Sequence, residues 1–129
     1  MPVYELFISD HGVNAYGLTI SSNDEFIAKQ PAALSGFLRA TKKAVVELGS
    51  AKDAGIDAVV KSAPEIDAKR EMKVLDRTFP LWSAKGGDLQ AFGAQSEQMW
   101  SQTIDTAKRL GIVENPPQVR AVYNATLLK

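Results

Sequence analysis

The sequence contains no cysteine and only one histidine, His11, among its 129 residues. Disulfide bonds, thiolate nucleophiles, cysteine-type zinc sites and histidine clusters are therefore excluded, and we expect neither a metal ion nor a cofactor. Net charge is also absent, because 15 basic side chains balance 15 acidic ones. Without a basic surplus we expect no nucleic-acid partner. No apolar run is long enough to cross a membrane, and the first ten residues lack the pattern of a signal peptide.

Hydrophobic residues make up 45% of the chain, which is enough for one packed core. Two short segments, residues 3–9 and 15–21, are rich in β-branched and aromatic side chains and flank a turn-forming stretch, DHGVN. This pattern predicts two β-strands near the N-terminus.

The rest of the chain predicts helices. A capping box of Ser22 and Glu25 opens a short helix before Pro31. Longer helices are expected at about residues 30–47, 54–61, 67–79 and 94–110. Gly111 and Ile112 then form a C-terminal stop of the Schellman type.

The helix over residues 30–47 carries both an apolar stripe and several basic residues. The stripe predicts a face turned to the core and consists of Leu34, Phe37, Leu38, Thr41, Val45 and Leu48. The basic residues Arg39, Lys42 and Lys43 lie off the stripe, and Lys43 stands four residues before Glu47. This spacing is typical of a solvated helix face rather than of a phosphate-binding one. Gly49 follows the last apolar residue and predicts the end of the helix.

Two strands followed by several amphipathic helices do not form a self-sufficient sheet, because a two-stranded ribbon is marginally stable alone. We therefore expect these strands to join the sheet of another chain in an oligomer, or to belong to a larger protein.

Four stretches occur in an order that resembles a known family: YGLTISSNDEFIAKQPAALSGFLRAT, APEID, GAQSEQMW and TAKRLGIVENP. The chain is similar to the C-terminal part of ABC-transporter substrate-binding proteins of the nitrate, sulfonate, taurine and thiamine-pyrimidine-precursor group. The resemblance implies an incomplete α/β fold of the type 2 periplasmic binding proteins, completed by oligomerisation or by a missing N-terminal half. It assigns residues 1–14 to the end of lobe two and the crossing segment, and residues 15–129 to lobe one.

The stretch DHGVN and the tyrosine after it hold the candidate ligand-binding residues, Asp10, His11, Asn14 and Tyr16. Ligands of open α/β sheets bind beside strand ends and crossings, although Asp, Gly and Asn are also common in ordinary turns. No Ser or Cys is placed for activation by His11, so we expect no catalytic residues. The sequence allows two roles for Trp82 and Trp100, stacking on a ring ligand or packing in the core.

The resulting expectation is non-catalytic binding of a small solute for ABC-type import, with a sulfonate, nitrate or aminopyrimidine as ligand. The partners would be an ABC permease, if the protein is full-length, and further copies of the chain. The alternatives are a stand-alone oligomeric interaction or regulatory module and, less favoured, an enzyme similar to thiamine-pyrimidine synthase. The family resemblance implies a periplasmic location, whereas the chain as written, without a signal peptide, would stay in the cytoplasm.

Overall fold

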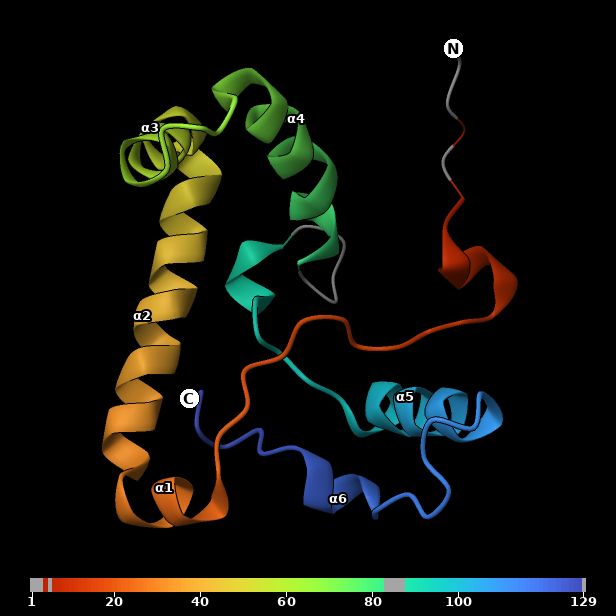
Figure 1. The fold of residues 1–129 in the computed structure, drawn as a ribbon. Helices are drawn as coiled ribbons and strands as arrows, with labels where there is room; N and C mark the ends of the chain where they lie inside the picture. Colours follow the sequence, from red (N-terminus) through yellow and green to blue (C-terminus); the bar gives the residue numbers. More distant parts are fainter. Residues whose placement is uncertain (1–3, 5, 83–87, 129) are drawn as a thin grey trace. The chain divides into compact units, whose positions relative to one another are not determined.

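A computed structural model describes residues 4, 6–82 and 88–128 of the chain. Every regular element within them is helical, and no strand occurs in these residues (Figure 1). In chain order the elements are η1 (Ile8–His11), α1 (Asp24–Lys29), α2 (Pro31–Ser50), α3 (Lys52–Ser62), α4 (Ala68–Thr78), η2 (Phe79–Leu81), η3 (Leu89–Ala91), α5 (Glu97–Arg109) and α6 (Val119–Val122), where η marks a 3-10 helix.

The chain divides into two units, each of which is described by itself. Unit 1 combines Met1–Asn23 with Gln95–Ala125, and unit 2 combines Asp24–Ala94 with Thr126–Lys129. In unit 1, α5 packs on α6. In unit 2, α2 contacts α1, α3 and η3, and α3 packs on α4.

The prediction of an α/β fold with two N-terminal strands is wrong for the part of the chain that the structure describes. Residues 3 and 5 of the first predicted strand lie outside that part. In the first segment the backbone carbonyls bond locally, because the Phe7 carbonyl accepts from the Asp10 N–H and the Ser9 carbonyl accepts from the Gly12 N–H, each at 3.1 Å. In the second segment the Tyr16 N–H donates to the Thr103 hydroxyl at 3.0 Å. These backbone groups are therefore not available to a ladder, and β-propensity forms no sheet without a neighbouring strand.

The predicted helices are confirmed, although α1 begins at Asp24, so Ser22 is not the residue that caps it. The ends of the longer helices follow local chemistry. Pro31 occupies the first position of α2, where its missing N–H is not needed. The Asp67 carboxylate caps α4 by accepting from the Arg70 N–H at 3.1 Å, and the Ser96 hydroxyl caps α5 by accepting from the Met99 N–H at 3.2 Å.

Two glycines near helix ends behave differently. Gly111 has φ 70°, and the Ile112 N–H reaches back to the Ala107 carbonyl at 2.9 Å, which confirms the predicted Schellman stop. The end predicted at Gly49 is wrong by one residue, because α2 continues through Ser50. A Cβ at Gly49 would overlap the side chain of Leu89, so this glycine instead allows η3 to approach α2 closely.

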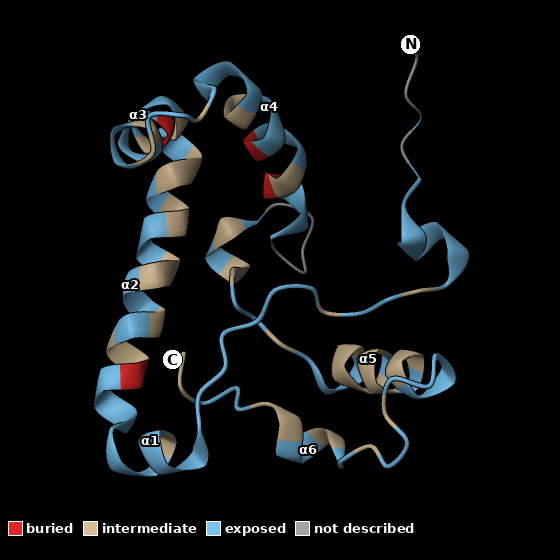
Figure 2. Ribbon diagram, in the orientation of Figure 1, coloured by how far each residue is buried: buried red, intermediate tan, exposed pale blue. Residues whose placement is uncertain are grey.

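The hydrophobic core of unit 2 is small. It contains the buried residues Ile56, Leu75 and Phe79, and the partly buried Leu48, Val60, Met72 and Leu89 pack against it. Figure 2 shows the buried positions on α2, α3 and α4. No described residue of unit 1 is buried to the same degree.

The apolar stripe predicted for α2 is only partly correct. Leu34 is buried, and Leu38, Val45 and Leu48 are half-buried. Phe37, however, is 58% exposed, so its predicted place in the core is wrong. The predicted Lys43–Glu47 pair is present at 3.7 Å on an exposed face. Helical periodicity identifies which residues share a face, but unit 2 does not supply enough neighbours to cover the whole face.

Candidate functional site

A polar cleft of about 220 Å³ lies within unit 1, between α5 and the segment that follows η1. Its lining consists of Gly12, Asn14, Gln102, Asp105, Thr106 and Arg109. The last four residues recur at intervals of three, one and three along α5 and therefore lie on one helix face. Gly12 and Asn14 supply the opposite wall.

Gly12 makes the turn that leads into this wall. Its φ of 76° lies in the left-handed region, which a side chain disfavours, and its N–H bonds to the carbonyls of Ile8 and Ser9. The turn ends η1 and directs the chain toward Asn14.

Tyr16 attaches the same segment to α5 through three contacts. Its N–H donates to the Thr103 hydroxyl at 3.0 Å, and its phenol oxygen accepts from the Ser96 N–H at 2.9 Å. Its ring lies 5.0 Å from the Trp100 ring, centroid to centroid. These contacts hold the backbone, the ring and the hydroxyl of Tyr16, so they fix the cleft wall that ends two residues earlier, at Asn14.

Trp100 is the centre of an aromatic cluster in unit 1. Besides Tyr16, it stacks with Tyr123 at 6.0 Å and an interplanar angle of 17°. Its indole N–H donates to the Gln95 side-chain oxygen at 3.1 Å. The half-buried indole thus has protein partners for its ring and its donor, which favours packing over ligand stacking.

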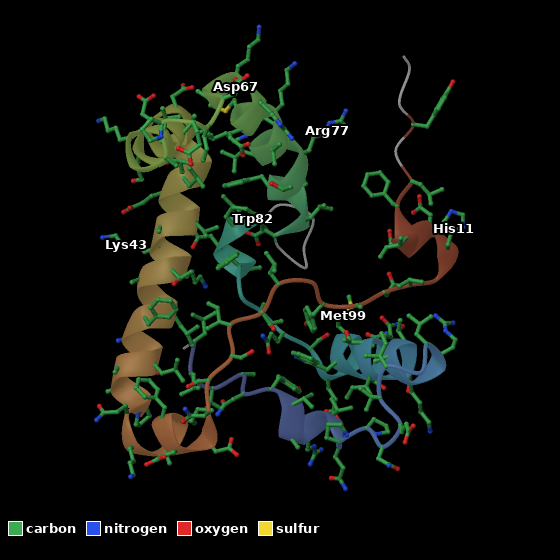
Figure 3. All side chains as sticks on the ribbon, viewed as in Figure 1. His11, Lys43, Asp67, Arg77, Trp82 and Met99 are labelled. Atoms are coloured by element: carbon green, nitrogen blue, oxygen red, sulfur yellow. The ribbon has the colours of Figure 1, made fainter. Side chains whose placement is uncertain are left out.

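Trp82 also contacts aromatic side chains of the protein, with 37% of its own surface exposed. In unit 2 its ring lies 5.1 Å from that of Phe79 and 6.5 Å from that of Phe92. Figure 3 labels this residue beside the core helices. Its position favours the packing interpretation as well.

The four predicted ligand-binding residues fall in different places. Asn14 lines the cleft, and Tyr16 anchors its wall. Asp10 and His11 belong to η1, are exposed and are not among the lining residues (Figure 3). The structure therefore places Asn14 in a cleft with residues of α5, whereas Asp10 and His11 lie outside the lining of that cleft.

Sequence reasoning missed the α5 residues of the cleft. Gln102, Asp105, Thr106 and Arg109 form a polar helix face, and such a face is normally solvated. No signal in the sequence separates a polar face that borders a cleft from one that borders bulk water.

The cleft offers hydrogen-bonding groups of several kinds. The Arg109 guanidinium presents donors suited to a carboxylate, sulfonate or other oxyanion. The amides of Asn14 and Gln102 and the hydroxyl of Thr106 both donate and accept. The Asp105 carboxylate accepts from a cationic group. A small solute with an anionic end and a cationic end matches this set.

Comparisons with known proteins found no matching family model, no similar curated protein and no similar solved structure.

No helix in the described ranges is both long and apolar enough to span a membrane. Within the same ranges, no group of three or more His, Asp or Glu side chains is arranged to hold a metal ion.

Proposed function

We propose that the chain binds a small aminosulfonate-like solute without chemistry, in the role of a solute-binding component of an ABC-type importer. The importer role rests on the four ordered sequence stretches that resemble that family. The binding role rests on one observation, the position of Arg109 in a polar cleft with Asn14 and Asp105.

The charges of the cleft select among the ligand classes. The Arg109 guanidinium pairs with a sulfonate in a bidentate manner, and Asp105 pairs with an ammonium group. A zwitterion such as taurine uses both side chains. Nitrate uses only Arg109, and a neutral aminopyrimidine uses neither charge fully, so taurine is favoured over both.

The expected affinity is modest. Asn14, Asp105 and Arg109 are exposed, and an open cleft leaves much of the ligand in contact with water. Bound solutes that gain high affinity are usually enclosed over most of their surface. A closed site would require a second wall, contributed by another segment or chain.

Calorimetric titration with taurine, nitrate and an aminopyrimidine tests this proposal. We expect taurine to bind most tightly, and Arg109→Gln to weaken binding about ten- to a hundredfold, since it removes a charge-assisted hydrogen bond. The matched control is Arg120→Gln, because Arg120 is exposed, lies outside the cleft lining and is 3.9 Å from Glu97. Equal binding by the two variants, or no binding of any solute at millimolar concentration, would contradict the proposal.

A second candidate, the interaction module, is favoured by the exposed apolar residues of unit 1. Four apolar side chains are exposed: Leu6, Ile8, Leu18 and Ile20. The relative exposure of Leu18 is 107%. Exposed apolar side chains that gather in one patch are typical of a protein contact. On this alternative, a further copy of the chain would cover these residues.

Light scattering of the Leu18→Ser and Ile20→Ser double variant tests the second candidate. If these residues mediate association, the variant should be smaller than the wild-type species at the same concentration. A wild-type monomer at high concentration would exclude self-association through this surface.

A further inference from the structure

Unit 2 contains a second groove, which lies between α3 and α4 and measures about 370 Å³. Its floor is apolar and includes the buried Ile56 and the half-buried Met72. α3 contributes Asp53 and Asp57 to one wall, and α4 contributes Lys69 and Lys73 to the other. The groove therefore has an acidic wall, an apolar centre and a basic wall.

The four wall charges lack partners in the described part of the chain. Elsewhere on these two helices, Lys52 of α3 forms an ion pair with Asp76 of α4. Asp53, Asp57, Lys69 and Lys73 form no such pair, and each is exposed.

Like charges also stand next to each other on each wall. Asp53 and Asp57 are four residues apart on α3, and Lys69 and Lys73 are four apart on α4. Adjacent like charges at this spacing destabilise a helix slightly. An occupant that brings cations to α3 and anions to α4 would remove both repulsions.

We propose that this groove is a self-association surface and that its occupant is the same groove of a second copy. A two-fold axis running along the groove turns the second copy over, so that its α4 faces the α3 of the first. Asp53 and Asp57 of each copy then meet Lys69 and Lys73 of the other, and the Met72 side chains meet near the centre. An isologous contact requires a surface that is complementary to itself, and this charge pattern has that property.

A second copy fits this pattern better than a small ligand. A small zwitterion would pair with one or two of the charges and leave the others unpaired. The second copy supplies the complementary carboxylates and ammonium groups at the same helical spacing, because they belong to the same two helices. The inference concerns unit 2 and does not depend on the solute site proposed in unit 1.

Association through exposed ion pairs is weak and depends on salt. Raising the ionic strength from about 0.1 M to about 1 M shortens the Debye length from about 10 Å to about 3 Å. We expect the dimer dissociation constant to rise about tenfold over this range. Association through the apolar residues of unit 1 would not weaken in this way, so the salt response separates the two surfaces.

Charge reversal tests the proposal by sedimentation equilibrium. The variant Asp53→Lys with Asp57→Lys has two basic walls, and the variant Lys69→Glu with Lys73→Glu has two acidic walls. We expect each variant alone to be monomeric and their equimolar mixture to form a heterodimer. The matched control, Lys61→Glu with Glu65→Lys, reverses exposed charges outside the groove lining and should dimerise as the wild type does.

Three results would overturn the proposal: a monomeric wild type at low salt, self-association of both reversed variants at wild-type strength, or a mixture that stays monomeric although each variant retains its helical circular dichroism. If a reversed variant does not fold, the salt dependence of the wild-type dimer decides, and a dimer insensitive to salt rejects the groove as its interface.

Discussion

Replacing Phe79 by alanine tests the core of unit 2. Phe79 is only 7% exposed and packs with Ile56 and Leu75. Its ring also contacts Trp82 and lies 5.3 Å from the Lys52 ammonium nitrogen. A buried Phe→Ala change costs about 3–5 kcal/mol from lost transfer free energy and the cavity left behind. The aromatic and cation contacts place Phe79→Ala toward the upper end of that range.

The same substitution at Phe37 serves as the control. Phe37 is 58% exposed, so alanine removes less than half of a buried ring's contribution and slightly raises helix propensity. We expect Phe37→Ala to lower the free energy of unfolding by about 1 kcal/mol or less.

Thermal and urea unfolding, followed by circular dichroism at 222 nm, compare the two variants. At about 4 °C per kcal/mol, Phe79→Ala should lower the Tm by about 12–20 °C and Phe37→Ala by less than about 4 °C. A larger loss for Phe37→Ala than for Phe79→Ala would refute the assignment of the core, and would mean that the stripe predicted from the sequence is the buried face after all.

The remaining predictions concern local features. Asp67→Ala removes the side-chain cap of α4 and should lower the free energy of unfolding by about 1 kcal/mol in the same experiments. Asp67→Asn keeps a capping oxygen and should retain most of the wild-type stability. Gly111→Ala places a Cβ at a φ of 70° and should destabilise α5 by about 1 kcal/mol, whereas Gly36→Ala, in the middle of α2 with open space around it, should be neutral or stabilising.

Local chemistry determines what could be predicted from the sequence. The helix starts at Pro31 and Asp67 and the stop at Gly111 were predictable, because each depends on groups a few residues away. The strands were not, because a strand depends on a neighbour that need not be close in the sequence. Residues 15–21 have strand-like composition, yet the Tyr16 N–H bonds to Thr103, 87 residues later.

The candidate site shows the same limit. Asn14 was predicted from the turn-forming stretch in which it stands, and it does line the cleft. Arg109, which carries the binding proposal, was not predicted, because it differs in no way at the sequence level from the many exposed arginines of helices. Only the path of residues 12–14 beside α5 gives it a role.

Amide chemical shifts of the ¹⁵N-labelled chain during a taurine titration test the central claim most directly. We expect the signals of Gly12, Asn14 and the face of α5 that includes Asp105 and Arg109 to move together along one saturable curve. The signals of α3 and α4 should stay in place at constant ionic strength. Saturable shifts confined to unit 2, or no shifts in the cleft at millimolar taurine, would contradict solute binding in unit 1.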